Sequence, residues 1–362
     1  MSGYGYIDDG RGSILKFTKK VFMKIFIKLI LLIIVAFLIY LFFPRDSDRL
    51  IYIPKKSDRY AMESISYQDT PINSFDYSLL KLFDFKDGWI RVESRTNLYK
   101  IFKKILKGSR EKSRKMVMYG GESIEDFSKK IAKQANLDSS KVLKKYRDIA
   151  YYSEGDITAK RYNIPYETTE SSTIAYMVYR GHNIYRDILK GSGVKFPSKE
   201  FKRYLIIASI IEKETQNYDE MPFISAVIHN RLNKNMRLQF DATLNYGKNR
   251  HRVITPDIIK SDNSRYNTYK YKGLPPEPLC SPSVVAFKAA LYPAAVDYLY
   301  FVKSGERHKF SKDYKSHIKR VSIYKRDVRS RIAQRVKRVI NGGVKVDFPE
   351  FKPKFNFNLP IK

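Results

Sequence analysis

Two glutamates at the end of a strongly apolar segment are the side chains best placed for acid–base chemistry. The segment Tyr204–Thr215 carries Glu212 and Glu214 in its last turn, and its apolar residues recur at spacings of three and four. This period predicts a buried helix, which Ser198 is expected to cap. A carboxylate at the end of a core helix is costly unless it is paired, hydrated or catalytic. The simpler alternative is that both glutamates mark the point where the helix meets solvent.

Helix geometry separates the two carboxylates. Residues two apart on a helix point about 200° apart, so Glu212 and Glu214 cannot line the same wall of a cleft. Glu212 lies above Ala208 and Ser209, whose small side chains leave room beside it, whereas the other glutamate lies above two isoleucines. The spacing therefore favours Glu212 as the residue that a ligand reaches.

A predicted strand and a tyrosine-rich loop supply further polar side chains. The segment Met236–Asp241 alternates apolar and polar residues, so Gln239 and Asp241 should share the polar face of a strand. The loop at 264–276 combines aromatic rings with amide and hydroxyl groups, which suit the apolar face and the hydroxyl edge of a sugar. The same composition fits stacked single-stranded nucleic acid. Taken alone, the alternating segment is more simply an ordinary half-exposed strand.

Charge and cysteine content limit the class of protein. The chain has 362 residues and a net charge of +32, which suits a protein that works beside an anionic surface such as phospholipid or an acidic polymer. A solvated Lys-rich surface explains the charge equally well. The single cysteine, Cys280, excludes an intrachain disulfide framework and a multi-cysteine metal site. We interpret His308 and His317 as structural, and we expect neither a metal nor a cofactor.

The first fifty residues predict a membrane anchor. Residues 25–43 form an apolar run interrupted only by Lys28. Such a run spans roughly 28 Å as a helix, close to the thickness of a bilayer core. It ends without the small residues of a signal-peptidase site, so the anchor should stay uncleaved. Lysines before the run outnumber the arginines just after it, which predicts that residues 1–24 are a cytoplasmic tail and that the chain after Pro44 is extracytoplasmic.

The rest of the chain is expected to form an α+β protein in three parts. Residues 44–197 should form a membrane-proximal region, residues 198–325 a mixed α/β domain that contains both glutamates, and residues 326–362 a basic tail. In the first part, Val117–Ala132 predicts a strand, a tight glycine turn and a helix capped by Ser123. This unit resembles the LysM-type modules that bind glycans.

The order of the motifs resembles the endolytic murein transglycosylase family (MltG, YceG-like). The resemblance covers about residues 198–325, and the ordered set is highly specific although single pieces are not. Upstream, Glu154-Gly155 followed by Tyr162 looks like an altered form of a family segment, with Asp156 in place of its first tyrosine. The matching motifs are Ala208–Thr215, Asn230–Leu232, Met236–Asp241, Tyr246-Gly247, Tyr266–Tyr269, Gly273–Pro276 and Tyr298–Val302.

The resemblance implies a lyase that cuts inside the glycan strand of peptidoglycan. The bond is that between N-acetylmuramic acid and N-acetylglucosamine, and the muramic 6-hydroxyl attacks its own anomeric carbon to leave a 1,6-anhydro end. One carboxylate can suffice, because the nucleophile is already tethered to the reacting sugar. Such an enzyme would terminate or trim nascent glycan strands.

The same resemblance implies roles for particular residues. Glu212 becomes the catalytic acid and base. Glu214 and Ser209 support it, and Gly273 and Pro275 belong to a turn that shapes the cleft edge. The expected substrate contacts are Gln239, Asp241, Asn267, Thr268 and Tyr269.

Location and partners follow from the anchor and the substrate class. We expect a single-pass protein of the bacterial cytoplasmic (inner) membrane with an extracytoplasmic catalytic domain. Its partners would be peptidoglycan strands, inner-membrane lipid and peptidoglycan synthases. Nucleic acid is not expected, because the chain has no helix-turn-helix, zinc or RNP signature.

Two other functions compete with the transglycosylase. If Asp241 lies opposite Glu212 with room for a water, a hydrolytic muramidase is the better interpretation, since hydrolases of this kind use two carboxylates. A non-catalytic protein that binds peptidoglycan or organises cell-wall synthesis would need only the LysM-like unit and the basic surface.

Overall fold

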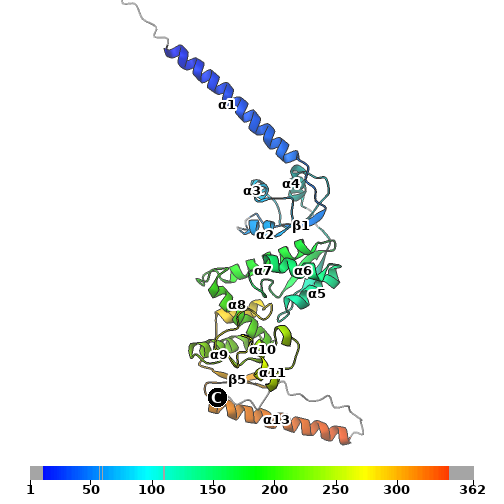
Figure 1. The fold of residues 1–362 in the computed structure, drawn as a ribbon, viewed down its shortest axis with the longest axis vertical. Helices are drawn as coiled ribbons and strands as arrows, with labels where there is room; N and C mark the ends of the chain where they lie inside the picture. The colour runs from blue at the N-terminus through cyan, green and yellow to red at the C-terminus, as the bar shows by residue number, and fades with distance from the viewer. Residues whose placement is uncertain (1–10, 57, 59, 109–110, 342–362) are drawn as a thin grey trace, which may run out of the picture. The chain divides into compact units, whose positions relative to one another are not determined.

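The computed structural model describes residues 11–56, 58, 60–108 and 111–341, and these form two compact units. The first unit is Met1–Glu111 and the second is Lys112–Lys362. Helices and antiparallel strand pairs alternate along the chain (Figure 1), so the predicted α+β class is confirmed. The boundary predicted at residues 197/198 falls inside the second unit and stays a prediction.

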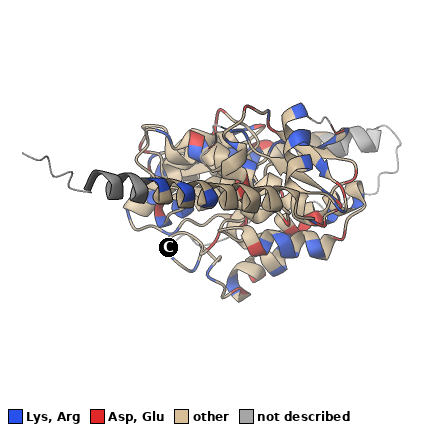
Figure 2. Ribbon diagram, turned by 90° about the horizontal axis from the view of Figure 1, so that it is seen from above, with Lys and Arg blue, Asp and Glu red and all other residues tan. Residues whose placement is uncertain are grey.

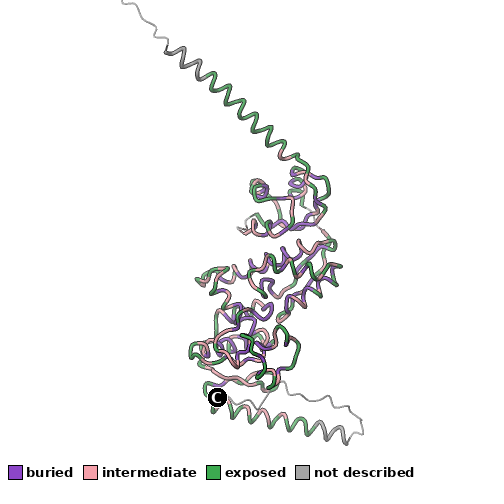
Figure 3. Tube along the Cα trace, viewed as in Figure 1, coloured by how far each residue is buried: buried purple, intermediate pink, exposed green. Residues whose placement is uncertain are grey.

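The first unit begins with a long apolar helix, α1 (Arg11–Phe42). Its segment Lys20–Phe42 is 23 residues long with a mean hydropathy of 3.1, enough in length and composition to cross a membrane. No residue of its most apolar stretch is buried against the protein (Figure 3). The prediction of one N-terminal apolar helix is therefore confirmed, and it starts earlier than residue 25.

A small α+β fold completes the first unit. Strands β1 (Arg49–Ile53) and β2 (Gly88–Val92) pair antiparallel over a core that includes Ile51, Tyr77 and Ile101. The helices are α2 (Ala61–Tyr67), α3 (Ser74–Leu80) and α4 (Leu98–Lys107).

The second unit opens with the strand, glycine turn and helix that the sequence predicts. Strand β3 (Ser113–Val117) pairs antiparallel with β4 (Arg161–Pro165). Helix α5 (Ile124–Ala135) starts at Ser123, whose side chain accepts a hydrogen bond from the Asp126 amide. Helices α6 (Ser139–Ile149) and α7 (Glu170–Ile188) follow. The likeness of this part to a LysM module stays a prediction.

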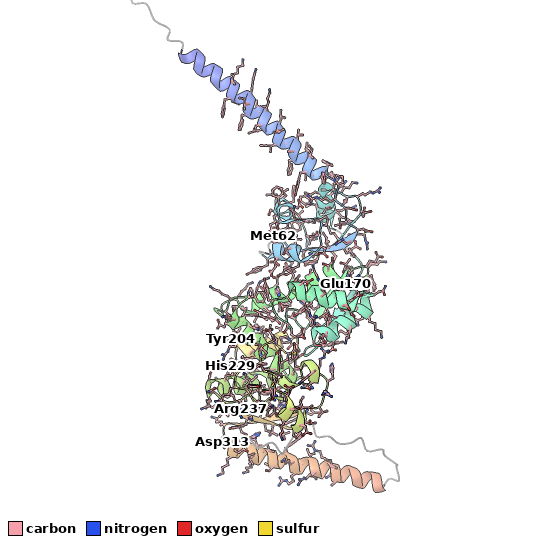
Figure 4. All side chains as sticks on the ribbon, viewed as in Figure 1. Met62, Glu170, Tyr204, His229, Arg237 and Asp313 are labelled. Carbon is pink, nitrogen blue, oxygen red and sulfur yellow. The ribbon has the colours of Figure 1, made fainter. Side chains whose placement is uncertain are left out.

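Helix α8 (Lys199–Glu214) forms the centre of the second unit. Its N-cap Ser198 accepts a hydrogen bond from the Phe201 amide at 3.0 Å, as expected. Helices α9 (Met221–Asn233) and α12 (Val284–Leu291) pack against it, and Tyr204 and His229 face each other across the α8–α9 pair (Figure 4). The core around α8 includes Phe201, Leu205, Ile207, Ile210, Ile211, Ile224, Ile228 and Phe287.

Short elements complete the second unit. These are α10 (Asp241–Leu244), a 3-10 turn (Gly247–Asn249), α11 (Pro256–Ser261), the antiparallel pair β5 (Tyr300–Ser304) and β6 (Arg307–Ser311), and α13 (Tyr314–Asn341).

The prediction of a strand at Met236–Asp241 is wrong. Residues 236–240 have no regular structure, and Asp241 begins α10 instead. Gln239 has a φ of 54°, in the left-handed region, which a strand does not adopt, although Leu238 and Phe240 are buried and Gln239 between them is only half-buried. The segment is held to the loop at 266–269, because the Gln239 amide donates to the Thr268 carbonyl at 3.2 Å.

Candidate active site

The Glu212 carboxylate lies at the start of α12. Its Oε2 accepts a hydrogen bond from the backbone amide of Ser283 at 2.8 Å. Ser283 is the N-cap of α12, and its own side chain accepts from the Ala286 amide. The backbone amides of the first turn of a helix have no partner within the helix, so they are free to bind a side chain such as Glu212. The side chain of Glu212 at the end of α8 is therefore oriented by the first residues of α12.

A glycine from the first part of the second unit presses against the same carboxylate. A methyl group added to Gly120 would lie 2.0 Å from Glu212 Oε1 and 2.7 Å from its Cδ. Gly120 is not among the residues with positive φ, so it is the close approach of the carboxylate that excludes a side chain. The glycine turn that sequence analysis treated as part of a LysM-like unit therefore borders Glu212.

The loops that carry these two contacts are hydrogen-bonded to each other. The Gly121 amide donates to the Ser281 carbonyl, and the Ser281 amide donates to the Glu122 carbonyl, both at 3.0 Å. The two segments, residues 120–122 and 281–283, form a paired bracket around the Glu212 carboxylate. We refer to them below as the glycine bracket.

Ser209 connects this bracket to α8. Its hydroxyl donates to the Ile206 carbonyl at 2.7 Å and accepts from the Leu279 amide at 3.0 Å. The next residue, Cys280, is buried and contacts the Ser209 carbonyl through its thiol. Ser209 was expected to leave space beside Glu212, and here it also anchors the loop that leads to Ser283.

Glu214 occupies a different environment from Glu212. Burial and the neighbouring charge of Asp241 raise the pKa of Glu214 to about 8, although the amide of Ala242 and the Arg231 guanidinium act in the opposite direction. Arg231 is buried, and its Nε donates to the Leu299 carbonyl at 2.7 Å. Glu214 is therefore a carboxyl group that stays largely protonated at neutral pH.

Asp241 lies beside Glu214 and is held by Tyr269. The Tyr269 hydroxyl donates to Asp241 Oδ1 at 2.6 Å, and burial raises the pKa of Asp241. Because residues two apart on a helix project in different directions, the pair of Asp241 with Glu214 is on another side of α8 from the carboxylate of Glu212. We call Glu214, Asp241, Tyr269 and Arg231 the second acidic cluster.

The other predicted substrate contacts are mostly internal. Asn267 is fully buried, and its Nδ2 donates to the carbonyls of Ile259 and Asp262 at 2.8 and 2.7 Å. Thr268 is buried and accepts from the Phe240 amide at 3.1 Å. Both residues shape the loop that carries Tyr269. Their roles as substrate contacts stay predictions, as does that of the half-buried Gln239.

The turn at 273–276 has the geometry that its glycine allows. Gly273 has a φ of 86°, in the region where side chains are strained, and Pro275 is buried. Nearby in the sequence, the ring of Tyr266 lies 4.7 Å from that of Tyr246. The assignment of Gly273 and Pro275 to a cleft edge stays a prediction.

The segment Glu154–Ala159, where the sequence departs from the family pattern, is buried and well bonded. Glu154 Oε2 accepts from the Ile124 amide at the start of α5 at 2.8 Å, and burial raises the pKa of Glu154 to about 8. Asp156 accepts from His182 at 2.7 Å. The Ala159 amide donates to the Pro282 carbonyl, next to Ser283. This segment therefore packs behind the glycine bracket.

Sequence reasoning missed two residues that touch Glu212. Gly120 was assigned only to a tight turn, and Ser283 was given no role. Within the described part of the chain, no group of three or more His, Cys, Asp or Glu could hold a metal ion. His308 instead pairs with Glu220 at 2.7 Å, a carboxylate partner that the sequence did not reveal.

Known proteins share this arrangement of the chain. A model of a family described as YceG-like matches residues 55–323. An endolytic murein transglycosylase of Bacillus subtilis (strain 168) is 28% identical over 305 residues, which cover 76% of this chain and 84% of that protein. One from Streptococcus pneumoniae (strain ATCC BAA-255 / R6) is 31% identical over 160 residues, which cover 42% of this chain and 28% of that protein. A crystal structure of a putative yceG-like protein from Listeria monocytogenes matches with a TM-score of 0.50 and 27% identity over 75% of this chain and 97% of that one.

Proposed function

This chain belongs to the YceG-like family, and from that premise we propose that it is a peptidoglycan lytic transglycosylase with Glu212 as its catalytic acid and base. The relatives from Bacillus subtilis and Streptococcus pneumoniae are named endolytic murein transglycosylases. The matched residues 55–323 include α8 and both segments of the glycine bracket.

The observation that carries the proposal is the way in which Glu212 is held. One carboxylate oxygen accepts a backbone hydrogen bond from Ser283, and the other lies against the bare Cα of Gly120. These contacts fix the direction of the carboxyl group while leaving the residue half-exposed. A general acid must be positioned within hydrogen-bond reach of the oxygen that it protonates. The arrangement is that of a side chain prepared to act on a ligand.

The proposed reaction needs one such group. Glu212 in its acid form protonates the glycosidic oxygen as the bond from the muramic C1 to that oxygen breaks. The resulting carboxylate takes the proton from the muramic 6-hydroxyl, whose oxygen forms the new bond to C1. The products are a 1,6-anhydromuramic end and a glucosamine 4-hydroxyl. Glu212 recovers its proton, and no water is consumed.

The position of Asp241 supports a reaction with one carboxylate. A hydrolase would need a second carboxylate across the scissile bond from Glu212. Asp241 instead hydrogen-bonds to Tyr269 and lies beside Glu214. A carboxyl group that is already engaged there is poorly placed to activate a water for Glu212. This favours the intramolecular reaction over the muramidase.

We further propose that α1 anchors the enzyme in the bacterial cytoplasmic membrane with its catalytic part outside the cytoplasm. The apolar segment Lys20–Phe42 has the required length, and basic residues precede its apolar centre. An anchored endolytic enzyme would meet strands as they are made, so it would terminate or trim nascent strands beside the peptidoglycan synthases.

The products distinguish the candidate functions. Purified glycan strands are incubated with the full chain in detergent, and the fragments are analysed by mass spectrometry. We expect internal cleavage and new ends that are one water lighter than hydrolysed ends. Reducing ends alone would show a muramidase. Strand binding without any cleavage that depends on Glu212 would favour the non-catalytic binding protein.

A further inference from the structure

Helix α13 is held to the second unit mainly near its beginning. It packs against β5 and β6, and the ring of His317 stacks on that of Tyr300 at 5.2 Å. The ring of Tyr314 lies 5.9 Å from Tyr300. Farther along the helix, Ile332 is 39% exposed. One side of the first turns is therefore docked, and the rest of the helix surface that the structure describes includes many exposed side chains.

The exposed surface of α13 is strongly basic. Between Tyr314 and Gln334 the helix has seven Lys and Arg residues and a single acidic residue, Asp327. Basic residues occur over the whole chain (Figure 2), but this density on one helix is more than general composition requires. The exposed basic residues are Lys315, Lys319, Arg320, Arg326, Arg329 and Arg331.

Exposed isoleucines lie among these charges. Ile318 and Ile332 are 41% and 39% exposed and lie about 40° apart around the helix, whereas Ile323, 41% exposed, points to the opposite side. Single exposed apolar residues are ordinary, but Ile318 and Ile332 share one side of the helix with Arg326 and Arg329, so that side is both basic and apolar. A basic helix with large exposed apolar residues is instead typical of helices that lie on a membrane surface.

Most of α13 also lies beyond the region that defines the family. The family model ends at residue 323, whereas the helix continues to Asn341. The residues proposed to act in glycan cleavage are all upstream of it. The basic surface of α13 therefore needs an explanation other than the proposed reaction.

We propose that α13 binds the surface of an anionic phospholipid bilayer. Its lysines and arginines would contact lipid phosphates, and Ile318 and Ile332 would enter the boundary between headgroups and acyl chains. A soluble polyanion would match the charges but offer no apolar partner to the isoleucines. The same chain carries α1, which is long and apolar enough to cross a membrane, so under the proposed anchoring a bilayer is always available to the chain.

The test places a fluorescent probe on the helix of the full chain. Ile332→Cys is labelled with a polarity-sensitive nitrobenzoxadiazole group, since the native Cys280 is fully buried and should not react. The protein is reconstituted through α1 into vesicles of phosphatidylcholine alone, or of phosphatidylcholine and phosphatidylglycerol in equal parts. We expect a severalfold rise in emission with a blue shift in the anionic vesicles only.

Charge reversal provides the matched control. The triple variant Arg326→Glu, Arg329→Glu, Arg331→Glu should abolish the rise. Reversal of three exposed lysines elsewhere in the second unit should preserve it; these are Lys115, Lys133 and Lys141.

Three outcomes would overturn the proposal: equal emission in both vesicle types, emission that survives the α13 reversal, and an equal rise when soluble polyphosphate is added without anionic lipid. The last would assign the helix to a soluble polyanion. The fluorescence measurements do not depend on glycan cleavage. The membrane-binding proposal can therefore fail while the proposed enzyme activity holds.

Discussion

Glu212 and Glu214 are two residues apart on one helix, yet their surroundings differ in every respect that matters for chemistry. Glu212 is held by a backbone amide and a bare glycine, both from distant loops. Glu214 is half-buried like Glu212 but lies near Asp241 and Arg231, and its pKa is raised to about 8. The first environment fixes the direction of a carboxyl group through the backbone, whereas the second places a carboxyl group among other charged side chains.

The comparison shows that a carboxyl group with a shifted pKa is not necessarily the reactive one. Shifted pKa values are common at active sites, but internal polar clusters shift them as well. In this chain the stronger argument for function is geometric, because close contacts converge on Glu212.

The largest effect is expected from Glu212→Gln. Loss of the general acid should lower the rate of strand cleavage by about 10²- to 10⁴-fold. Glu214→Gln is the matched change and should lower it less than about tenfold. Turnover is measured from the yield of anhydro ends, with circular dichroism to verify folding. Equal losses in the two variants would remove the functional distinction between the glutamates.

Removing the amide that orients Glu212 should have the next largest effect. Ser283 has a φ of −71°, which proline can adopt, so Ser283→Pro deletes the hydrogen-bond donor with little backbone strain. We expect kcat to fall by about 10- to 100-fold, since small displacements of a catalytic group are costly. Ser283→Ala keeps the amide and loses only the cap, at about 1 kcal/mol of stability. The idea fails if the alanine variant loses as much activity as the proline variant.

Gly120→Ala tests the opposite side of the same carboxylate. The added methyl group must displace Glu212, because it would start 2.0 Å from Oε1. We expect kcat to fall by about tenfold or more with a smaller change in KM. Gly193→Ala is a useful control, because a methyl group there would have no neighbour within 4 Å although its φ is positive. If Gly120→Ala leaves kcat and KM unchanged, the position of the Glu212 carboxylate is not important for the reaction.

The second acidic cluster should show itself in the pH dependence of stability. A carboxyl group whose pKa is raised in the folded state stabilises the fold most below its ordinary value of 4.5, and this contribution is lost as the pH rises toward about 8. Glu214→Gln should therefore reduce the fall in Tm over this range by about 2–4 °C. Glu200→Gln, an exposed change in the first turn of α8, should leave the slope as in the wild type. Thermal melts from pH 4 to pH 9 provide the measurement, and parallel curves for Glu214→Gln and wild type would contradict the assignment.

The smallest effect is expected from Tyr269→Phe. It removes the hydrogen bond to Asp241, which is worth about 1 kcal/mol, and leaves Glu212 untouched. We expect a modest loss of stability and, if Tyr269 and Asp241 contact substrate as predicted, a severalfold rise in KM with kcat nearly unchanged. A large loss of kcat would instead connect the second acidic cluster to the chemical step.

The sequence contained enough information for the parts of the fold that depend on local periodicity. The apolar period of α8, its Ser198 cap, the apolar run in α1 and the strand, turn and helix at β3–α5 were all readable in this way. The failure at Met236–Asp241 has an equally local cause. Alternation of side chains did not reveal that Gln239 adopts a left-handed conformation or that the segment has no strand partner.

The surroundings of Glu212 could not be read from the sequence for a different reason. Its contacts are with a backbone amide and with a missing side chain, so residue types give no direct signal of either. Only the packing of the β3–α5 region against the start of α12 brings Gly120 and Ser283 to the same carboxylate. The hydrogen bonds that Asn267 and Thr268 make within the protein could not be predicted either. Polar residues in a loop can face solvent or bond to the backbone, and the sequence does not distinguish the two.

The glycine bracket also has a consequence for the order of folding. Ser283 is 71 residues from Glu212 in the chain, and Gly120 is still farther away in the other direction. Contacts of such long sequence separation form late, after local helices have appeared. A chain still emerging from the ribosome can contain a complete α8 and still have no oriented acid. Lytic activity would then begin only when the whole second unit has folded.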